Sequence, residues 1–291
     1  MRPVSSRVVT LWITVLCLLA SLFSLNVLAA AQPRAGSKHK LSQPLPAAGI
    51  STVKRRTKPG APPPVTTDTW TGGGGANTNW SDAANWNNGA ITSGENIAIS
   101  TTTANTFVDT NFSIGTLTLS NSGDSATINN AVVLTVGGNI TNNGTLTVNS
   151  GGSTTELVIG ASGVTLSGSG TLTMSNNANN YIFGSVAADT LTNSSTIQGS
   201  GFLGDNQLTL VNSGTIDATQ SNALIVDPSG TATNTGTMEA TTGTLVLFGN
   251  GGTTTINNAG GTIKATGSDV QLQSSVIISG GTPNTCEAVS V

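Results

Sequence analysis

The chain has 291 residues, of which only 8% are charged, whereas about a quarter of the residues of an ordinary globular protein carry charge. The charge is also sorted along the sequence. Nine of the ten Lys and Arg residues lie at or before Lys58, and all thirteen Asp and Glu residues lie at or after Asp68. This distribution excludes a uniform single domain, a nucleic-acid binder with a basic face and an ordinary charge-coated cytosolic enzyme.

Residues 1–31 have the features of a secretory signal peptide. Two arginines precede an apolar run over 8–28, which ends in a small-x-small cleavage site before Gln32. We therefore expect cleavage after residue 31 and a secreted or surface-displayed protein. The apolar run is also long enough for a retained membrane anchor, so that alternative stays open. Cleavage would remove Cys17 and leave Cys286 as the one thiol, which excludes an intramolecular disulfide.

Residues 32–67 form a second segment, rich in basic residues and proline. It contains a basic run over 54–58 and a proline triplet over 62–64, with few large apolar side chains. Such a composition cannot bury enough surface to offset the entropy of ordering, and we expect an extended, disordered linker. Two interpretations stay open: a solvated tail, or an electrostatic tether to anionic lipid or a cell-surface polymer. We expect membrane contact through the signal peptide or this linker alone.

From Asp68 onward the sequence indicates an N-terminal cap with the first strands, residues 68–115, and then a repeat region, residues 116–291. In the repeat region a phrase similar to Gly-Thr-Leu-Thr recurs with an average spacing of about 24 residues. The threonines that mark this phrase are Thr116, Thr145, Thr171, Thr196, Thr215, Thr237 and Thr262, with Ser in place of Gly before Thr196. Two further short strand patterns lie between successive marks, and turns rich in Gly, Asn and Ser separate them.

Three strands per period predict one coil of a parallel β-helix, and the seven marks predict about seven coils. We expect an all-β, right-handed solenoid. Helices are excluded because no segment sustains the apolar spacing of a helix. Alternation would send Leu, Ile and Val into the core and Thr, Ser and charged side chains outward. Asn at the repeated corners is expected to adopt the left-handed conformation and to stack, bonding the turns above and below.

The beginning of the cap carries a resemblance to a known group of proteins. Residues 69–75 (Thr-Trp-Thr-Gly-Gly-Gly-Gly), 79–81 (Asn-Trp-Ser) and 85–87 (Asn-Trp-Asn), followed by the repeats, resemble bacterial secreted β-strand-repeat proteins of the autotransporter-passenger-like and adhesin-like kind. The resemblance implies surface display on a Gram-negative-type bacterium, adhesion or a stalk, and no cofactor. The repeat breaks at 283–287, and we expect a chain truncated at its C-terminus. An uncapped last coil would then permit end-to-end self-association.

Trp70, Trp80 and Trp86 admit two interpretations. Exposed, they would form a platform on which a glycan stacks; buried, they would plug the open N-terminal coil. A solenoid needs its end closed, which favours the plug. Another motif, Gly-x-Gly-x-x-Gly over 199–204, has no helix after it and no basic residue nearby. We interpret it as a turn between strands and not as a nucleotide site.

Gln198, Asp217, Glu239 and Lys264 occupy one position of four consecutive coils and should form a ladder on an outer face. Two of them, Asp217 and Glu239, could then approach the carboxylate separation of a retaining glycosidase, ~5–5.5 Å. However, the sequence after Asp68 has no Arg or His and a single Lys, so the bases for lyase or triad chemistry are missing. We expect a solvated ladder, no catalytic residue, no cofactor and no metal site, since two carboxylates fall short of a calcium ligand set.

Ice binding is a further possibility, because the Thr-x-Thr phrases at 116–118, 145–147 and 171–173 would stack as an array that resembles the flat faces of ice-binding β-helices. The array fails at Gln198, and Thr suits any exposed strand. The sequence therefore predicts a secreted, non-enzymatic adhesin-like or structural stalk. The alternatives are a carbohydrate-binding or polysaccharide-active β-helix and an ice-binding protein. The expected partner is a cell-surface glycan or protein, and not nucleic acid.

Overall fold

The computed structural model describes residues 65–160, 163–249 and 252–281, together with the backbone of 289–290. The chain divides into two compact units, Met1–Gly60 and Ala61–Val291, and every described residue belongs to the second. The predicted signal peptide, the predicted linker up to residue 64 and the predicted break in the repeat at 283–287 lie outside the described residues.

The described residues form an all-β parallel solenoid, with 27 strands and one short 3-10 helix, η1 (Ala83–Asn85). The strands make three sheets, in which all strand pairs are parallel. The ten-stranded sheet contains β1 (Thr67–Thr69), β2 (Asn96–Ile99), β5 (Leu117–Leu119), β8 (Ile140–Asn142), β11 (Val164–Ser167), β14 (Thr190–Asn193), β17 (Thr209–Asn212), β20 (Thr231–Asn234), β23 (Thr254–Asn257) and β26 (Val276–Ser279). The eight-stranded sheet contains β3 (Asn105–Val108), β6 (Ser125–Ile128), β9 (Thr145–Val148), β12 (Thr171–Met174), β15 (Thr196–Gly199), β18 (Thr215–Ala218), β21 (Thr237–Ala240) and β24 (Thr262–Ala265). The nine-stranded sheet contains β4 (Phe112–Ile114), β7 (Val133–Val136), β10 (Thr155–Ile159), β13 (Asn180–Gly184), β16 (Gly201–Gly204), β19 (Leu224–Val226), β22 (Leu245–Phe248), β25 (Val270–Gln273) and β27 (Val289–Ser290).

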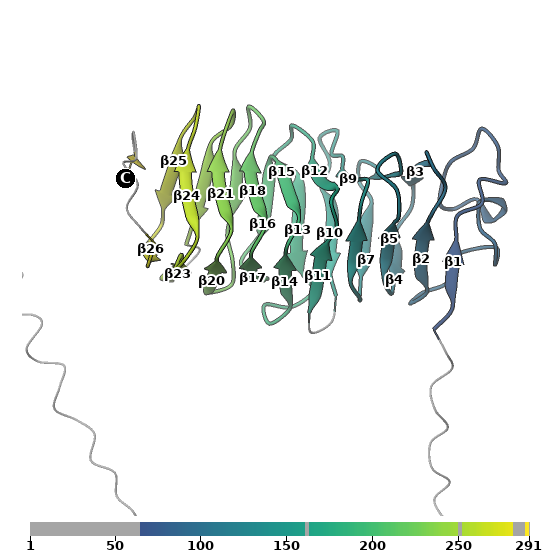
Figure 1. The fold of residues 1–291 in the computed structure, drawn as a ribbon, viewed down its shortest axis with the longest axis horizontal. Coiled ribbons are helices and arrows are strands. Elements are labelled where there is room, and N and C mark those ends of the chain that lie inside the picture. The colour runs from purple at the N-terminus through teal and green to yellow at the C-terminus, as the bar shows by residue number, and fades with distance from the viewer. Residues whose placement is uncertain (1–64, 161–162, 250–251, 282–288, 291) are drawn as a thin grey trace, which may run out of the picture. The chain divides into compact units, whose positions relative to one another are not determined.

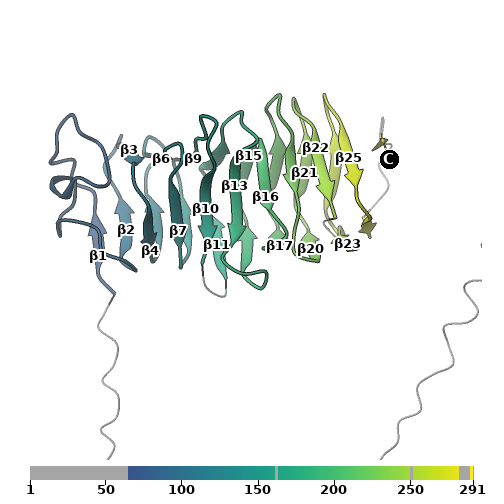
Figure 2. The same cartoon turned by 180° about the vertical axis from the view of Figure 1, so that it is seen from behind.

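From β2 to β25 the chain visits the ten-, eight- and nine-stranded sheets in strict rotation, one strand in each. Strands of successive turns therefore lie side by side, from β1 at one end of the solenoid to β26 near the other (Figures 1 and 2). The predicted parallel β-helix is confirmed. It has about eight turns, one more than the marks predicted.

Thr116, the first of the seven marks, does not lie on the same sheet as the other six. The six marks from Thr145 to Thr262 are register partners in the eight-stranded sheet. Thr116, however, precedes β5 in the ten-stranded sheet, and the register partners that lead up to Thr145 are Ser125 and Asn105. The phrase Gly-Thr-Leu-Thr leads into an alternating strand of the ten-stranded sheet at 115–118 and of the eight-stranded sheet at 144–147 and 170–173, so local sequence does not reveal which sheet it joins.

The core follows from the alternation within each short strand. In β12, for example, Leu172 and Met174 are almost fully buried while the threonines between and before them face outward. Inward residues of neighbouring turns are register partners, as Leu146, Leu172 and Ile197 show. Each turn thus covers the apolar side chains of the next, and burial of this surface stabilises the stack.

A ladder of four asparagines runs inside one corner of the solenoid, between the ten- and eight-stranded sheets. Asn193 Nδ2 donates to Asn212 Oδ1 at 2.7 Å, Asn212 Nδ2 to Asn234 Oδ1 at 2.7 Å, and Asn234 Nδ2 to Asn258 Oδ1 at 2.6 Å. The predicted stacking of corner asparagines is confirmed. The predicted left-handed backbone is wrong for these four residues, because they are absent from the positive-φ residues of the described chain. Strands β14, β17 and β20 end at the asparagine itself, so its backbone is extended and the turn begins after it.

Candidate functional site

The three tryptophans lie together at the first end of the solenoid and are buried. Their exposed fractions are 5% for Trp70, 0% for Trp80 and 4% for Trp86. Trp86 packs edge-to-face against both others, with ring centroids 5.1 and 5.4 Å apart. The indole of Trp80 donates to Thr106 Oγ1 at 3.0 Å, and that of Trp86 donates to the carbonyl of Trp80 at 2.9 Å. This arrangement is that of a plug, and it leaves almost no indole surface on which a sugar would stack.

The structure places Gln198, Asp217, Glu239 and Lys264 in register on strands β15, β18, β21 and β24. They form a ladder on the outer face of the eight-stranded sheet. At the end of the ladder Lys264 Nζ lies 2.9 Å from Glu239 Oε2; the lysine is exposed and the glutamate half-buried, and such a surface pair contributes about 0–1 kcal/mol.

Asp217 is the chemically distinct member of this ladder. The hydroxyl of Thr241 donates to both of its carboxylate oxygens at 3.0 Å. Burial raises the pKa of Asp217, and the negative charge of Glu239 on the next turn raises it further, against the lowering effect of Thr241. A carboxyl group with a raised pKa beside a second carboxylate has the elements of an acid and a nucleophile. Here, however, both carboxylates already have partners. Thr241 donates to Asp217, and Lys264, the last member of the ladder, pairs with Glu239.

The Thr-x-Thr array is shorter than the sequence suggested. Because Thr116 and Thr118 belong to the ten-stranded sheet, they do not stack on the phrases at 145–147 and 171–173. These two phrases are direct register partners, and the turn before them has Ser125-x-Thr127. The paired threonines therefore cover two adjacent turns only, which is a small area for an ice-binding face.

A fourth group of residues, which the sequence interpretation missed, lies on the outer face of the nine-stranded sheet. Tyr181 of β13, Phe202 of β16, Ile225 of β19 and Val246 of β22 are register partners on four successive turns. Phe183 points to the same face, since it lies two residues after Tyr181 on the same strand. We call these five residues the aromatic strip.

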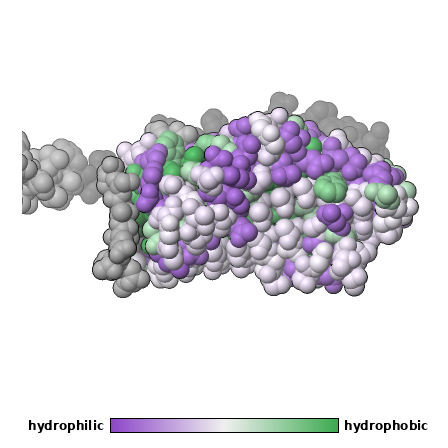
Figure 3. All heavy atoms as spheres, turned by 90° about the horizontal axis from the view of Figure 1, so that it is seen from above, coloured by the Kyte–Doolittle hydropathy of each residue, from purple (hydrophilic) through white to green (hydrophobic). Residues whose placement is uncertain are grey.

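The rings of the strip contact one another. Tyr181 and Phe202 stack with their ring centroids 5.0 Å apart and their planes 4° from parallel, and Phe183 meets Tyr181 edge-to-face at 6.4 Å. All three rings are half-buried. Outer positions of the other two sheets carry mainly Thr, Ser, Asn and charged side chains. On the face seen in Figure 3, hydrophilic and neutral residues likewise predominate, and hydrophobic residues form small separate patches.

The turn that carries Phe202 is tightly built. At its corner, Gly199 and Gly201 have φ of 123° and 120°. A Cβ added to Gly201 would lie 2.3 Å from the carbonyl oxygen of Asn180, so only glycine is accommodated there. The glycine motif at 199–204 is thus the predicted turn together with strand β16.

Corner loops of the two neighbouring turns meet across this tight turn. Before the strands of the nine-stranded sheet, Asn176 Nδ2 donates to Ser221 Oγ at 2.8 Å. After those strands, Ser229 Oγ donates to the carbonyl of Ala187 at 2.5 Å. Each contact joins residues two turns apart, and the pair of contacts frames the strip at Phe202.

Two carboxylates lie beside the strip. Glu156 of β10 is the register partner of Tyr181 on the preceding turn, and Asp205 directly follows β16. Burial raises the pKa of the Tyr181 phenol, and the negative charges of Asp205 and Glu156 raise it further. Burial also raises the pKa of Asp205. The strip is therefore apolar in its middle and negative at its edge.

The alternation within single strands already indicates that the aromatic side chains of the strip point outward. In Tyr181-Ile182-Phe183, an inward Ile182 forces both aromatic residues outward, and an inward Leu203 does the same for Phe202. Read one strand at a time, these residues look like core. Only the alignment of successive turns shows that the outward aromatic residues share a column.

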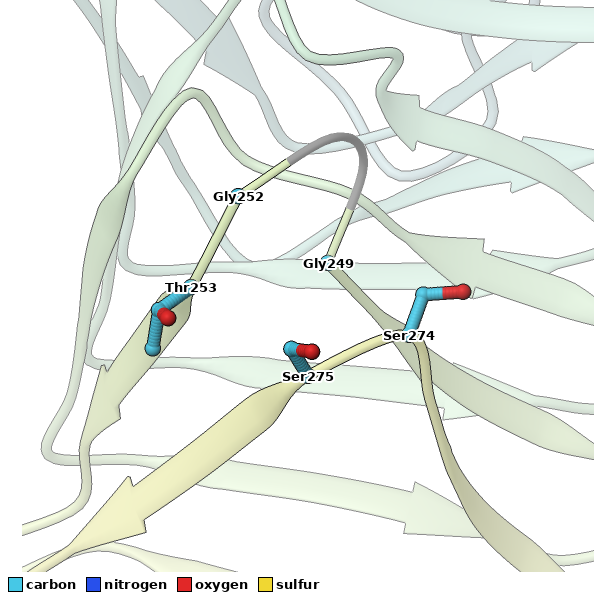
Figure 4. A pocket seen from close by; sticks show the side chains of 5 residues that line it. All are labelled: Gly249, Gly252, Thr253, Ser274 and Ser275. Atoms are coloured by element: carbon cyan, nitrogen blue, oxygen red, sulfur yellow. The ribbon is translucent and has the colours of Figure 1, made fainter.

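A shallow hollow of about 410 Å³ lies at the corners that follow β22 and β25 (Figure 4). Its described lining consists of Gly249, Gly252, Thr253, Ser274 and Ser275. The two serines have positive φ, 57° and 64°, which shapes this corner. The lining offers hydroxyl and backbone groups but no charge.

The described residues contain no helix that is long and apolar enough to cross a membrane, and no cluster of three or more His, Cys, Asp or Glu side chains that could hold a metal ion. By its fold the described part of the chain is a parallel β-solenoid. No family model matches the sequence, and neither a curated protein nor a solved structure is significantly similar to it.

Proposed function

We propose that this chain acts as a secreted or surface-displayed β-helix stalk with an adhesin-like role and without catalysis. The observation that carries the proposal is the uninterrupted parallel stack of about eight turns, closed at its first end by the tryptophan plug. At a rung spacing of ~4.8 Å, eight turns make a rod about 38 Å long. Such a rod sets a partner-binding surface at a fixed distance from its point of attachment.

The outer surface supports a structural role. Most outward positions hold Thr, Ser or Asn, which pair with the same residue types on the next turn. The ladder carboxylates are engaged by Thr241 and Lys264, and so they contribute to the stack itself.

Export is tested by expressing the full chain in a bacterial host and sequencing the N-terminus of the product. We expect the protein outside the cytoplasm, with Gln32 at its N-terminus. An intact Met1 on a protein confined to the cytoplasm would contradict the proposal.

A second candidate, a polysaccharide-active β-helix, is favoured by the raised pKa of Asp217 beside Glu239. It is tested by incubating the purified chain with a panel of polysaccharides and measuring new reducing ends. We expect none. Hydrolysis that Asp217→Asn abolishes, with Gln198→Ala as a ladder control that keeps it, would replace the stalk by an enzyme.

A further inference from the structure

The aromatic strip is an outward-facing apolar surface, whereas the outer faces of the other two sheets are mainly polar. Val246 is buried, so the accessible part comprises Tyr181, Phe202 and Ile225, three register partners over two rung spacings, or about 10 Å. Half-buried aromatic rings on the outside of a sheet are the residue type that dominates binding hot spots. The strip also lies where corner loops of neighbouring turns are tied together, so its backbone is held in place.

Its charge narrows the class of partner. Glu156 and Asp205 stand beside the strip, and the one basic residue after Asp68 is Lys264. That lysine is paired with Glu239 on a different sheet. No basic side chain among the described residues pairs with the two carboxylates at the strip, so a partner with positive charge would be favoured there.

Two other occupants are disfavoured by the same observations. A second copy packed strip to strip would bring its own Glu156 and Asp205 against these carboxylates, which is repulsive. A sugar chain stacks on open ring faces, whereas Tyr181 and Phe202 cover part of each other's faces. An apolar partner segment needs only contact with the strip, and not an open ring face.

We propose that the aromatic strip binds a basic, apolar peptide segment of a partner protein. Apolar side chains of the segment cover Tyr181, Phe202 and Ile225, and its Lys or Arg residues pair with Glu156 and Asp205. A length of about 10 Å corresponds to about three extended residues or about six helical ones. The inference rests on the proposed adhesin-like function and specifies the partner of the stalk.

The test uses the purified full chain and a fluorescent peptide of about 12 residues built from Leu and Arg only. Two peptides serve as controls: one with Glu in place of Arg, and one with Ser in place of Leu. We expect the Leu/Arg peptide to bind, and both controls to bind at least about tenfold more weakly.

The strip variants are Tyr181→Thr with Phe202→Thr, and Glu156→Gln with Asp205→Asn. Thr is the residue that other outward positions carry, and Asn tolerates the positive φ of Asp205. We expect about tenfold weaker binding from the first pair. The second pair should weaken binding severalfold at low salt, with the difference shrinking near 1 M salt. Glu239→Gln removes one charge on another sheet and should leave binding unchanged.

A second measurement needs no variant, because Tyr181 is the single tyrosine of the chain. Its ionisation can be followed by ultraviolet absorbance while Arg stays charged. Arg side chains near Glu156 and Asp205 lower the pKa of Tyr181 and apolar side chains over the phenol raise it, so we expect bound Leu/Arg peptide to shift this pKa and the Leu/Glu peptide to leave it unchanged. If the double Thr variant fails to fold, the two control peptides and the Glu156→Gln, Asp205→Asn variant decide the matter.

The proposal would be overturned by no binding at low salt or by unchanged affinity in the Tyr181→Thr, Phe202→Thr variant. Equal binding of the Ser/Arg peptide would reduce the effect to unspecific attraction and overturn it as well. These outcomes are separate from failure of the stalk. A chain that stays in the cytoplasm would contradict the stalk without changing peptide binding in solution.

Discussion

Replacement of Asn212 by Ala should be among the most destabilising single changes in the corner of the solenoid. Asn212 is fully buried. Its amide nitrogen donates to Asn234 Oδ1 at 2.7 Å and to two backbone carbonyls, of Gly214 and Thr237, at 3.2 Å. Its amide oxygen accepts from Asn193 at 2.7 Å.

The magnitude follows from these four contacts. Each hydrogen bond contributes about 1 kcal/mol net, and a buried partner left unpaired costs about 1–3 kcal/mol. Asn234 loses the amide that donates to its side-chain oxygen, while Asn193 keeps the backbone carbonyl of Ser195 at 3.1 Å. We expect Asn212→Ala to lower the free energy of unfolding by about 3–5 kcal/mol.

Two related variants calibrate this value. Asn258 ends the ladder and is 6% exposed, and its amide donates only to Gly261 O at 3.3 Å. Asn258→Ala should therefore cost about 1–2 kcal/mol. Asn257, its neighbour, is exposed and bonds only a backbone amide at 3.3 Å, so Asn257→Ala should cost less than about 0.5 kcal/mol.

The assay is urea unfolding of the full chain, followed by circular dichroism, with amide hydrogen exchange as a local readout. In a stacked repeat, stability is a sum of turn and interface contributions, so exchange should rise most in β14, β17 and β20. If Asn212→Ala costs no more than Asn257→Ala, the ladder does not stabilise the corner and the reasoning fails.

Three further changes test the plug, a tight corner and a buried acid. Trp80→Ala should cost about 3–5 kcal/mol in thermal unfolding, because it empties the centre of the plug; a loss below about 1 kcal/mol would mean that the end is closed by other residues. Gly201→Ala should destabilise clearly more than Gly152→Ala in the same assay, because both have positive φ but only Gly201 has a carbonyl oxygen 2.3 Å from the added Cβ; equal losses would contradict the clash. Asp68 is fully buried and burial raises its pKa, so the folded state is penalised once this carboxyl must ionise. Asp68→Asn should therefore be more stable than the parent at pH 7. Near pH 3, below the unfolded pKa of about 3.9, the two proteins should be equally stable. A difference in stability that does not change with pH would refute this.

The sequence predicted the fold because the information needed is local and repeated. Short alternating strands and turns rich in Gly and Asn occur in every coil, and only a parallel stack buries their single apolar face. The tryptophan plug was predictable for a similar reason. The large apolar residues between β1 and β2 are best buried at the open end of the first turn, which they close.

The sheet assignment was not predictable with the same certainty. The phrase at Thr116 is locally identical to the later marks, yet it lies on another sheet, since corner lengths vary from turn to turn. The aromatic strip was missed because its members are partners only after the turns are aligned. The positive-φ positions outside glycine in the described chain are Ala131, Asp205, Asn206, Ser274 and Ser275, and none of them belongs to the asparagine ladder.

The low charge of the chain follows from the register of the stack. Every outward residue meets the residue at the same position of the next turn at ~4.8 Å, so a like-charge pair repeats along the rod. Asp217 and Glu239 form such a pair, and the charge of Glu239 adds to the burial that raises the pKa of Asp217. Thr, Ser and Asn avoid this repulsion. In the ladder, Lys264 offsets part of the negative charge by pairing with Glu239.

The aromatic strip has no comparable partner among the described residues. Glu156 and Asp205 lie beside the aromatic rings, and burial raises the pKa of Asp205. The outer positions of the other two sheets are mainly polar, whereas the aromatic strip is apolar and has two carboxylates beside it. This is the physical reason to look for the binding partner of the stalk at the nine-stranded sheet.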